Sequence, residues 1–219
     1  NSEQAPQQVR LRLQKSPLNH GFAVTLRLLP ERPQQSFSLT ELAMAEDVRA
    51  GLTELLRHQH GLIIIAGATG QGKTTTLAAL NHLLLDKKVI SLEDPIEIVQ
   101  AQIEQRWVDA QQQSFAEHIK MALREDPDVI SISEIRDTQT AQAAVMAALT
   151  GHLVTATIHA HDCIGAIQRL VNLGVNLNEL IAEGVLQGVV AQHLVHANES
   201  TQLLAEYVLL DYPARRYLR

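Results

Sequence analysis

Residues 67–74 read GATGQGKT and carry the spacing G-x-x-x-x-G-K-[ST]. Glycines in such a loop let the backbone turn its N–H groups inward, where they can surround phosphate groups. Lys73 would reach the β- and γ-phosphates of a bound nucleotide, and the Thr74 hydroxyl would ligate Mg²⁺. The residues expected to bind ATP here are Gly67, Thr69, Gly70, Gln71, Gly72, Lys73, Thr74 and Thr75.

The segments on either side of this loop have the patterns of a strand and a helix. Residues 62–66, LIIIA, form a short and fully apolar run of the kind found in buried parallel strands. A helical pattern follows from about Gly72 to Leu85, so the positive end of that helix would point at the phosphates. A chance match in a glycine-rich turn is the alternative, and the flanking elements argue against it. We therefore predict that the chain binds ATP.

Two acidic segments follow predicted strands and offer the carboxylates that nucleotide hydrolysis needs. An apolar strand, Val129–Ile132, comes just before Glu134, and in nucleotide hydrolases an acid at this place organises Mg²⁺ or its waters. Glu93, with its neighbours Asp94 and Glu97, could orient or activate an attacking water. The alternatives are a surface glutamate at a strand end and a solvated acidic turn.

A histidine, His159, ends the strand predicted over residues 152–158 and could contact the γ-phosphate that distinguishes ATP from ADP. The alternative is a structural histidine. A metal site built from His152, His159 and His161 is rejected, because the first two lie at opposite ends of an extended span of roughly 20 Å. The single cysteine, Cys163, excludes a Cys-x-x-Cys zinc pattern, so no zinc is predicted.

The elements that must position these residues alternate between strand and helix. After the loop, strands are predicted at 88–92, 128–133, 152–158 and 203–210, and helices at 114–124, 138–150, 163–173 and 177–194. Such alternation favours an α/β fold, with a doubly wound and mainly parallel sheet covered by helices on both faces. Ligands of such sheets bind at the carboxyl ends of the strands, where Glu93, Glu134 and His159 are expected.

The residues before the phosphate loop have a different character. Residues 9–29 read as two short strands around a turn that contains Pro17 and Gly21. Residues 30–38 have little hydrophobicity and two prolines, which is typical of a linker. From Ser38 the leucine spacing predicts a helix that Gly61 ends.

The composition limits the possible partners. The chain of 219 residues is 46% hydrophobic and 19% charged, as globular proteins are, and its net charge is -6. This charge provides no overall basic surface, so direct binding of nucleic acid is not expected. No apolar run approaches the roughly 18 residues that a membrane helix needs, and no signal peptide is recognised at the start. A cytoplasmic protein is therefore expected.

Four segments, in their order and spacing, resemble the motifs of the secretion and type IV pilus ATPase superfamily. They read GATGQGKTTT, SLEDPIE, LREDPDVISISEIRD and TGHLVTATIHAHD, in the places of its Walker A loop, aspartate box, Walker B segment and histidine box. The resemblance implies a RecA-like P-loop NTPase domain over residues 39–219 after a linker over 30–38. Residues 1–29 resemble the C-terminal fragment of a smaller N-terminal α+β domain, whose Arg12 and Arg27 would reach the nucleotide. AIQRLVNLGV and GVVAQHLV match the family's C-terminal helices.

The resemblance also implies a function, that of an ATP-hydrolysing motor that uses ATP and Mg²⁺. The full-length protein would form a homo-hexamer at the cytoplasmic face of the cell membrane and act on an inner-membrane platform protein. The chain looks most similar to motors that assemble pili and the competence pseudopili of DNA uptake. It lacks the four-cysteine zinc insertion of many type II secretion motors, and Ser133 stands where the family usually has glycine beside the phosphates.

Other functions are compatible with parts of this pattern. A pilus retraction motor or a type II secretion motor would carry the same four motifs. A nucleotide-gated scaffold would bind ATP and hydrolyse little of it, which Ser133 and the short N-terminal part suggest. A DNA-translocating enzyme of the RecA-like type is disfavoured by the acidic charge and by the lack of a basic, aromatic-lined strip.

Overall fold

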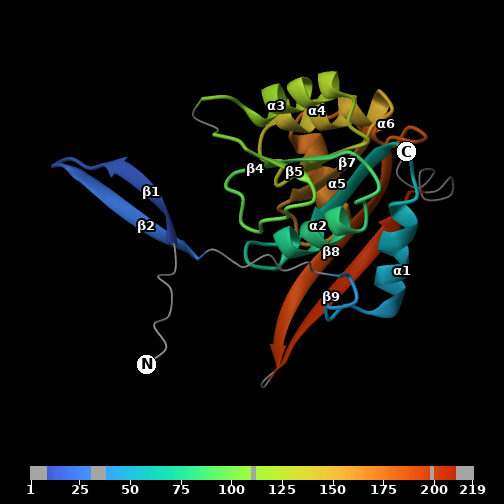
Figure 1. The fold of residues 1–219 in the computed structure, drawn as a ribbon, viewed down its shortest axis with the longest axis horizontal. Helices are drawn as coiled ribbons and strands as arrows, with labels where there is room; N and C mark the ends of the chain where they lie inside the picture. Colours follow the sequence, from blue (N-terminus) through green and yellow to red (C-terminus); the bar gives the residue numbers. More distant parts are fainter. Residues whose placement is uncertain (1–8, 31–37, 110–111, 198–199, 211–219) are drawn as a thin grey trace.

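The computed structural model describes residues 9–30, 38–109, 112–197 and 200–210, and within them the chain forms two separate sheets (Figure 1). The first is a hairpin of β1 (Val9–Pro17) and β2 (Phe22–Pro30). The second has seven strands in the order β5-β4-β6-β7-β3-β8-β9. These are β3 (Gly61–Ala66), β4 (Val89–Glu93), β5 (Glu104–Trp107), β6 (Val129–Ile132), β7 (Leu153–Ile158), β8 (Leu186–Ala197) and β9 (Ser200–Leu209).

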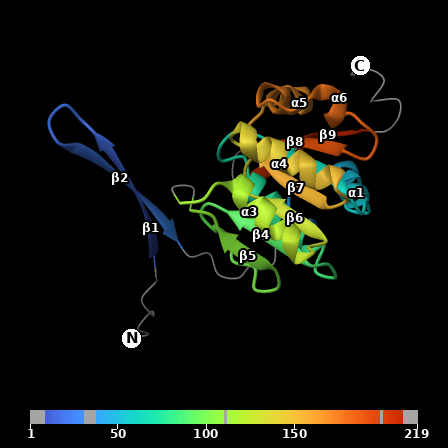
Figure 2. The same cartoon turned by 90° about the horizontal axis from the view of Figure 1, so that it is seen from above.

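The large sheet is parallel from β5 to β8, and only β9 runs antiparallel to its neighbour β8. Helices cover both of its faces (Figure 2). They are α1 (Glu46–Leu55), α2 (Lys73–His82), α3 (Phe115–Ala122), the 3₁₀ turn η1 (Leu123–Glu125), α4 (Thr138–Leu149), α5 (Cys163–Asn172) and α6 (Leu177–Leu180). Helices α1 and α2 pack into one hydrophobic core, and α3, α4 and α5 pack into the core on the other face. The predicted doubly wound, mainly parallel α/β fold is confirmed.

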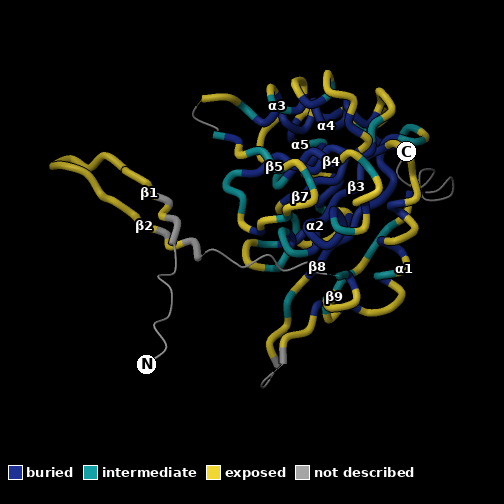
Figure 3. The backbone as a smooth tube through the Cα atoms, viewed as in Figure 1, coloured by how far each residue is buried: buried dark blue, intermediate teal, exposed yellow. Residues whose placement is uncertain are grey.

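The four central strands are buried along their whole length, which explains why they read as apolar runs (Figure 3). Three of the covering helices begin at residues whose side chains cap them. At the start of α3, the Ser114 side chain accepts a hydrogen bond from the Glu117 N–H. At the starts of α4 and α5, the side chains of Asp137 and Asp162 each accept a hydrogen bond from the N–H three residues later. Such caps satisfy N–H groups that have no partner within the helix, so they fix where each helix starts.

The prediction of a helix over residues 177–194 is wrong. Helix α6 ends at Leu180, and β8 occupies most of the remaining range, pairing with β3 on one side and β9 on the other. Gly184, with a φ of 81°, turns the chain between them. The segment GVVAQHLV, which was matched to a C-terminal helix, is therefore a strand, and its buried Val189 and Val190 suit a sheet position.

Two further differences concern helix α1 and strand β5. Helix α1 covers only Glu46–Leu55. The residues before it, which include the buried Leu39 and Met44, form an irregular segment that bridges to Leu203. Strand β5, EQRW, was not predicted, because an exposed edge strand of this composition shows no apolar alternation. Residues 31–37 of the predicted linker lie outside the described residues. None of the described helices is long and apolar enough to cross a membrane.

Close packing of β8 against α1 generates a stability prediction. A Cβ atom at Gly188 would lie 2.7 Å from Leu55 Cδ2 and 2.9 Å from the Val208 carbonyl oxygen. We expect Gly188→Ala to lower the free energy of unfolding by about 1–3 kcal/mol, as overpacking does. Chemical denaturation measures this, with Gln202→Ala, at an exposed site of β9, as the control. Equal stability of Gly188→Ala and the parent would contradict this packing.

Candidate nucleotide site

The phosphate loop connects the end of β3 to the start of α2, as predicted. Gly70 and Gly72 both have φ of 80°, a conformation that side-chain-bearing residues rarely adopt. Gly67 has no positive φ, but a Cβ there would lie 2.8 Å from the carbonyl oxygen of Gln192. Helix α2 begins at Lys73 directly after this loop, so its first N–H groups face the space that the loop surrounds.

The ammonium group of Lys73 is fixed at the centre of the loop. Its Nζ donates hydrogen bonds to the carbonyl oxygens of Gly67, at 2.7 Å, and Ala68, at 2.9 Å. An ammonium has three N–H donors, so these two bonds leave one for a phosphate oxygen. Burial lowers the pKa of Lys73, and the nearby charge of Glu134 opposes that shift. The side chain is therefore preorganised beside both the loop and Glu134.

Glu134 lies just beyond the end of β6 and is held on both of its oxygens. His159 Nε2 is 3.0 Å from Oε1, and an Arg136 guanidinium nitrogen is 2.7 Å from Oε2. Burial lowers the pKa of His159, and the nearby charges of Lys73 and Arg136 lower it further against the opposing effect of Glu134. At neutral pH the imidazole is therefore neutral, and its Nε2 lies beside the Glu134 carboxylate.

Glu93 is the last residue of β4 and is only 7% exposed. Ser91 Oγ and Gln105 Nε2 each donate a hydrogen bond of 2.8 Å to its Oε1. Burial raises the pKa of Glu93, while these two hydrogen bonds hold part of that rise back and the charge of Glu97 adds to it. A carboxylate with a raised pKa is a stronger base, which suits the activation of water.

The parallel strands bring these groups to one edge of the sheet. The Ser133 N–H donates to the Leu92 carbonyl oxygen at 2.9 Å, which joins the end of β4 to that of β6. The Thr157 hydroxyl donates to the Ser133 carbonyl oxygen, which joins β6 to β7. Glu93, Glu134 and His159 thus lie at the carboxyl ends of three neighbouring strands, as the sequence predicted.

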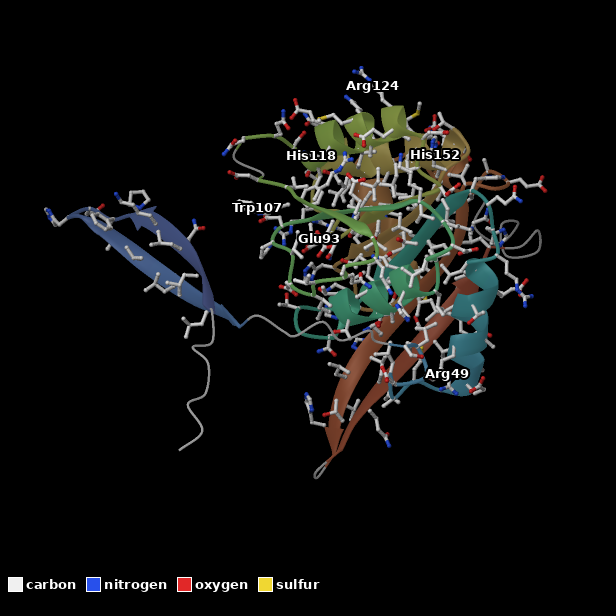
Figure 4. The ribbon with its side chains drawn as sticks, viewed as in Figure 1. Arg49, Glu93, Trp107, His118, Arg124 and His152 are labelled. Atoms are coloured by element: carbon white, nitrogen blue, oxygen red, sulfur yellow. The ribbon has the colours of Figure 1, made fainter. Side chains whose placement is uncertain are left out.

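Several residues at this edge were not anticipated. Ser91 lies two residues before Glu93, a spacing that puts both side chains on one face of a strand, so periodicity could have indicated it. Arg136 lies two residues beyond Glu134 in a loop, where no periodicity applies. Gln105 belongs to the unpredicted strand β5. Figure 4 shows Glu93 near Trp107, its Cα partner in β5 and the only tryptophan of the sequence.

The expected Mg²⁺ ligands fit that ion by their chemistry. Thr74 lies in the first turn of α2 and is half-buried, and Glu134 lies at the carboxyl end of β6. A hydroxyl and a carboxylate suit Mg²⁺, which keeps several waters and needs few protein ligands when phosphates bind it as well. Among the described residues, no group of three or more His, Cys, Asp and Glu side chains could hold a metal ion.

The remaining predicted contacts concern the hairpin and the loop surface. Arg12 and Arg27 are direct partners in the register of β1 and β2. Their side chains lie outside the described part of the chain, so their contact with nucleotide stays a prediction. Thr69 lies at the exposed tip of the loop, and Thr75 is half-buried beside Thr74.

The sequence and the fold both match known proteins. Residues 3–209 match the family model described as Type II/IV secretion system protein. The type II secretion system protein HxcR of Pseudomonas aeruginosa is 44% identical over 190 residues, which cover 85% of this chain and 40% of HxcR. The competence protein ComGA of Bacillus subtilis is 37% identical over 191 residues, covering 85% of this chain and 52% of ComGA. The chain thus spans about half or less of the length of these relatives.

Solved structures support the same relationship. The pilus retraction motor PilT with bound ADP superposes with a TM-score of 0.78 at 32% identity, over 95% of this chain and 62% of PilT. The ATPase DotB of Legionella pneumophila superposes with a TM-score of 0.75 at 29% identity, over 95% of this chain and 60% of DotB. These similarities confirm the predicted RecA-like P-loop fold.

The lowered pKa of His159 predicts a pH dependence of stability. Because the folded state resists protonation more than the unfolded state, the neutral imidazole favours folding above its ordinary pKa of about 6.5. That contribution is lost as pH falls from there through the lowered folded pKa. We expect the free energy of unfolding to fall more steeply over this window in the parent than in His159→Gln. Chemical denaturation at several pH values measures this. If the free energies of unfolding of the two proteins fell in parallel with pH, the lowered pKa of His159 would be contradicted.

Proposed function

Since the chain belongs to the type II/IV secretion system protein family, we propose that it binds ATP at the phosphate loop and hydrolyses it to power a motor. The motor would assemble a type IV pilus or competence pseudopilus, or drive type II secretion. The observation that carries the proposal is the position of Glu134. It contacts His159 and Arg136, and its charge is close enough to Lys73 to raise the pKa of that lysine. A loop that only bound nucleotide would not need this acid at the adjoining strand end.

Each group has a role in the proposed hydrolysis. The loop N–H groups bind the phosphates, and Lys73 stabilises the negative charge that develops during transfer. Thr74 and Glu134 would hold Mg²⁺, which when bound neutralises phosphate charge. Glu93 orients the attacking water, whose oxygen bonds to the γ-phosphorus while the bond to the bridging β–γ oxygen breaks. The products are ADP and inorganic phosphate.

His159 is proposed to sense the γ-phosphate. In the described state its Nε2 lies 3.0 Å from Glu134 Oε1. A γ-phosphate oxygen near Lys73 would attract the imidazole away from Glu134, and ADP has no such oxygen. Movement of His159 would leave Glu134 Oε1 available for Mg²⁺ or its waters. Binding of ATP would in this way prepare the carboxylate for hydrolysis.

The domain organisation is part of the proposal. Residues 1–29 would belong to a smaller N-terminal domain, residues 30–38 to a linker, and residues 39–219 to the ATPase domain. Closure of the small domain would bring Arg12 and Arg27 to the nucleotide and convert hydrolysis into a rigid-body rotation. The full-length protein would form a homo-hexamer at the cytoplasmic face of the membrane, where it acts on a platform protein.

The direction of the motor has one competing assignment. Similarity to HxcR and ComGA supports secretion and pseudopilus assembly, which we favour. Similarity to PilT, a retraction motor, supports retraction as the second candidate. Both assignments use the same hydrolytic site.

The hydrolytic role of Glu134 gives a direct test. Glu134→Gln removes the negative charge and keeps the side-chain size, so we expect kcat to fall about 10²- to 10⁴-fold. The dissociation constant of ATP should change little, because Lys73 and the loop remain. Steady-state phosphate release and equilibrium ATP binding measure the two quantities.

Glu183→Gln, at an exposed position beyond α6, is the matched control and should behave as the parent. Hydrolysis by Glu134→Gln at the parental rate would refute the role of Glu134. Tight ATP binding by a full-length parent that releases no phosphate would instead favour the nucleotide-gated scaffold. Stimulation of hydrolysis by DNA would favour the translocating enzyme.

A further inference from the structure

Strand β8 holds the middle of the phosphate loop through hydrogen bonds across more than 100 residues of sequence. Gln192 Nε2 donates to the carbonyl oxygen of Gln71 at 2.6 Å, and the Leu194 N–H donates to the side-chain Oε1 of Gln71. Gln192 is fully buried. Its side-chain amide is therefore shielded from bulk water.

The same short stretch of β8 also sets the space available to the loop glycines. A Cβ at Gly67 would lie 2.8 Å from the Gln192 carbonyl oxygen, and one at Gly72 would lie 3.4 Å from Gln192 Nε2. The start, the middle and the end of the loop thus all adjoin Gln192 or Leu194. Strand β8 therefore packs directly against the loop along its length.

The hairpin of β8 and β9 also contacts the segment that carries the predicted γ-phosphate sensor. His193 Nε2 is 2.8 Å from the carbonyl oxygen of His161, two residues after His159. The Glu206 carboxylate in β9 accepts a hydrogen bond of 2.9 Å from the Cys163 N–H at the start of α5. One hairpin therefore positions both the phosphate loop and the histidine segment.

We infer that Gln192 and Gln71 are positioning residues that hold the phosphate loop in its nucleotide-binding shape, so that the β8–β9 hairpin sets nucleotide affinity. The inference rests on the proposed function, since it takes ATP to be the ligand of the loop. Neither residue needs to touch the nucleotide. Gln192 acts on the Gln71 carbonyl, and Gln71 joins the loop to the Leu194 N–H, so each fixes the backbone whose N–H groups bind the phosphates.

The α- and β-phosphates are common to ATP and ADP, and they stay bound during hydrolysis. A loop held less firmly should therefore bind the ground state and the transition state less well to the same degree. Such a uniform loss raises KM and leaves kcat nearly unchanged. This separates the inferred role from that of Glu134, whose loss should act on kcat.

The test uses Gln192→Met, which keeps the volume and removes the side-chain N–H donor to the Gln71 carbonyl. It also uses Gln71→Ala, at a half-buried site, which removes the side-chain Oε1 that accepts from the Leu194 N–H. We expect each to weaken ATP and ADP binding by a similar factor, about 3- to 10-fold, as loss of one hydrogen bond would. Equilibrium binding with fluorescent ATP and ADP analogues measures this. For Gln192→Met, steady-state kinetics should show kcat within about two-fold of the parent.

Gln202→Met, at an exposed position of the same hairpin, is the matched control and should bind as the parent does. Lower thermal stability of Gln192→Met with unchanged dissociation constants, together with unchanged constants in Gln71→Ala, would overturn the inference and make both residues merely structural. A drop in kcat without a change in affinity would overturn it as well. A parent that binds neither ATP nor ADP would instead refute the proposed function on which the inference rests.

Discussion

Parallel pairing of β4, β6, β7 and β3 is the constraint on which the rest of the structure depends. Because these strands run in one direction and in register, their carboxyl ends meet at one edge of the sheet. The loop after β3, Glu93, Glu134 and His159 come from four separate segments, and this pairing alone brings them together. Burial of the strands on both faces makes a slip in register costly, so the positions of these groups are fixed by the core.

Charge balance is the second feature of this edge. The charges of Glu134 and Arg136 both act on the pKa of Lys73, and Glu134 raises the pKa of Arg136, while the neutral His159 has its Nε2 3.0 Å from the Glu134 carboxylate. The charge-assisted hydrogen bond from Arg136 stabilises the partly buried Glu134 carboxylate. Arrival of a polyphosphate would change this balance strongly, because it adds several negative charges beside the same cations.

The predictable part of the molecule is that governed by local pattern. Apolar runs revealed the buried strands, and the glycine spacing around Lys73 revealed the loop. The strand β8 was mistaken for a helix because its pairing with β3 is long-range, and no local rule reveals it. The bond from Gln192 was not foreseen for the same reason, whereas Arg136 was missed because it lies in a loop, where no periodicity applies. Edge strand β5 lacked an apolar face, so it gave no signal.

The central claim is that the chain binds ATP through the loop in which Lys73 is held. The most direct measurement is equilibrium binding of MgATP by the parent and by Lys73→Ala, with folding of both verified by circular dichroism. Because Lys73 supplies a charge-assisted hydrogen bond to the phosphates, its loss should weaken binding about 10- to 100-fold. Equal affinities of the two proteins would contradict the assignment of this loop as the nucleotide site.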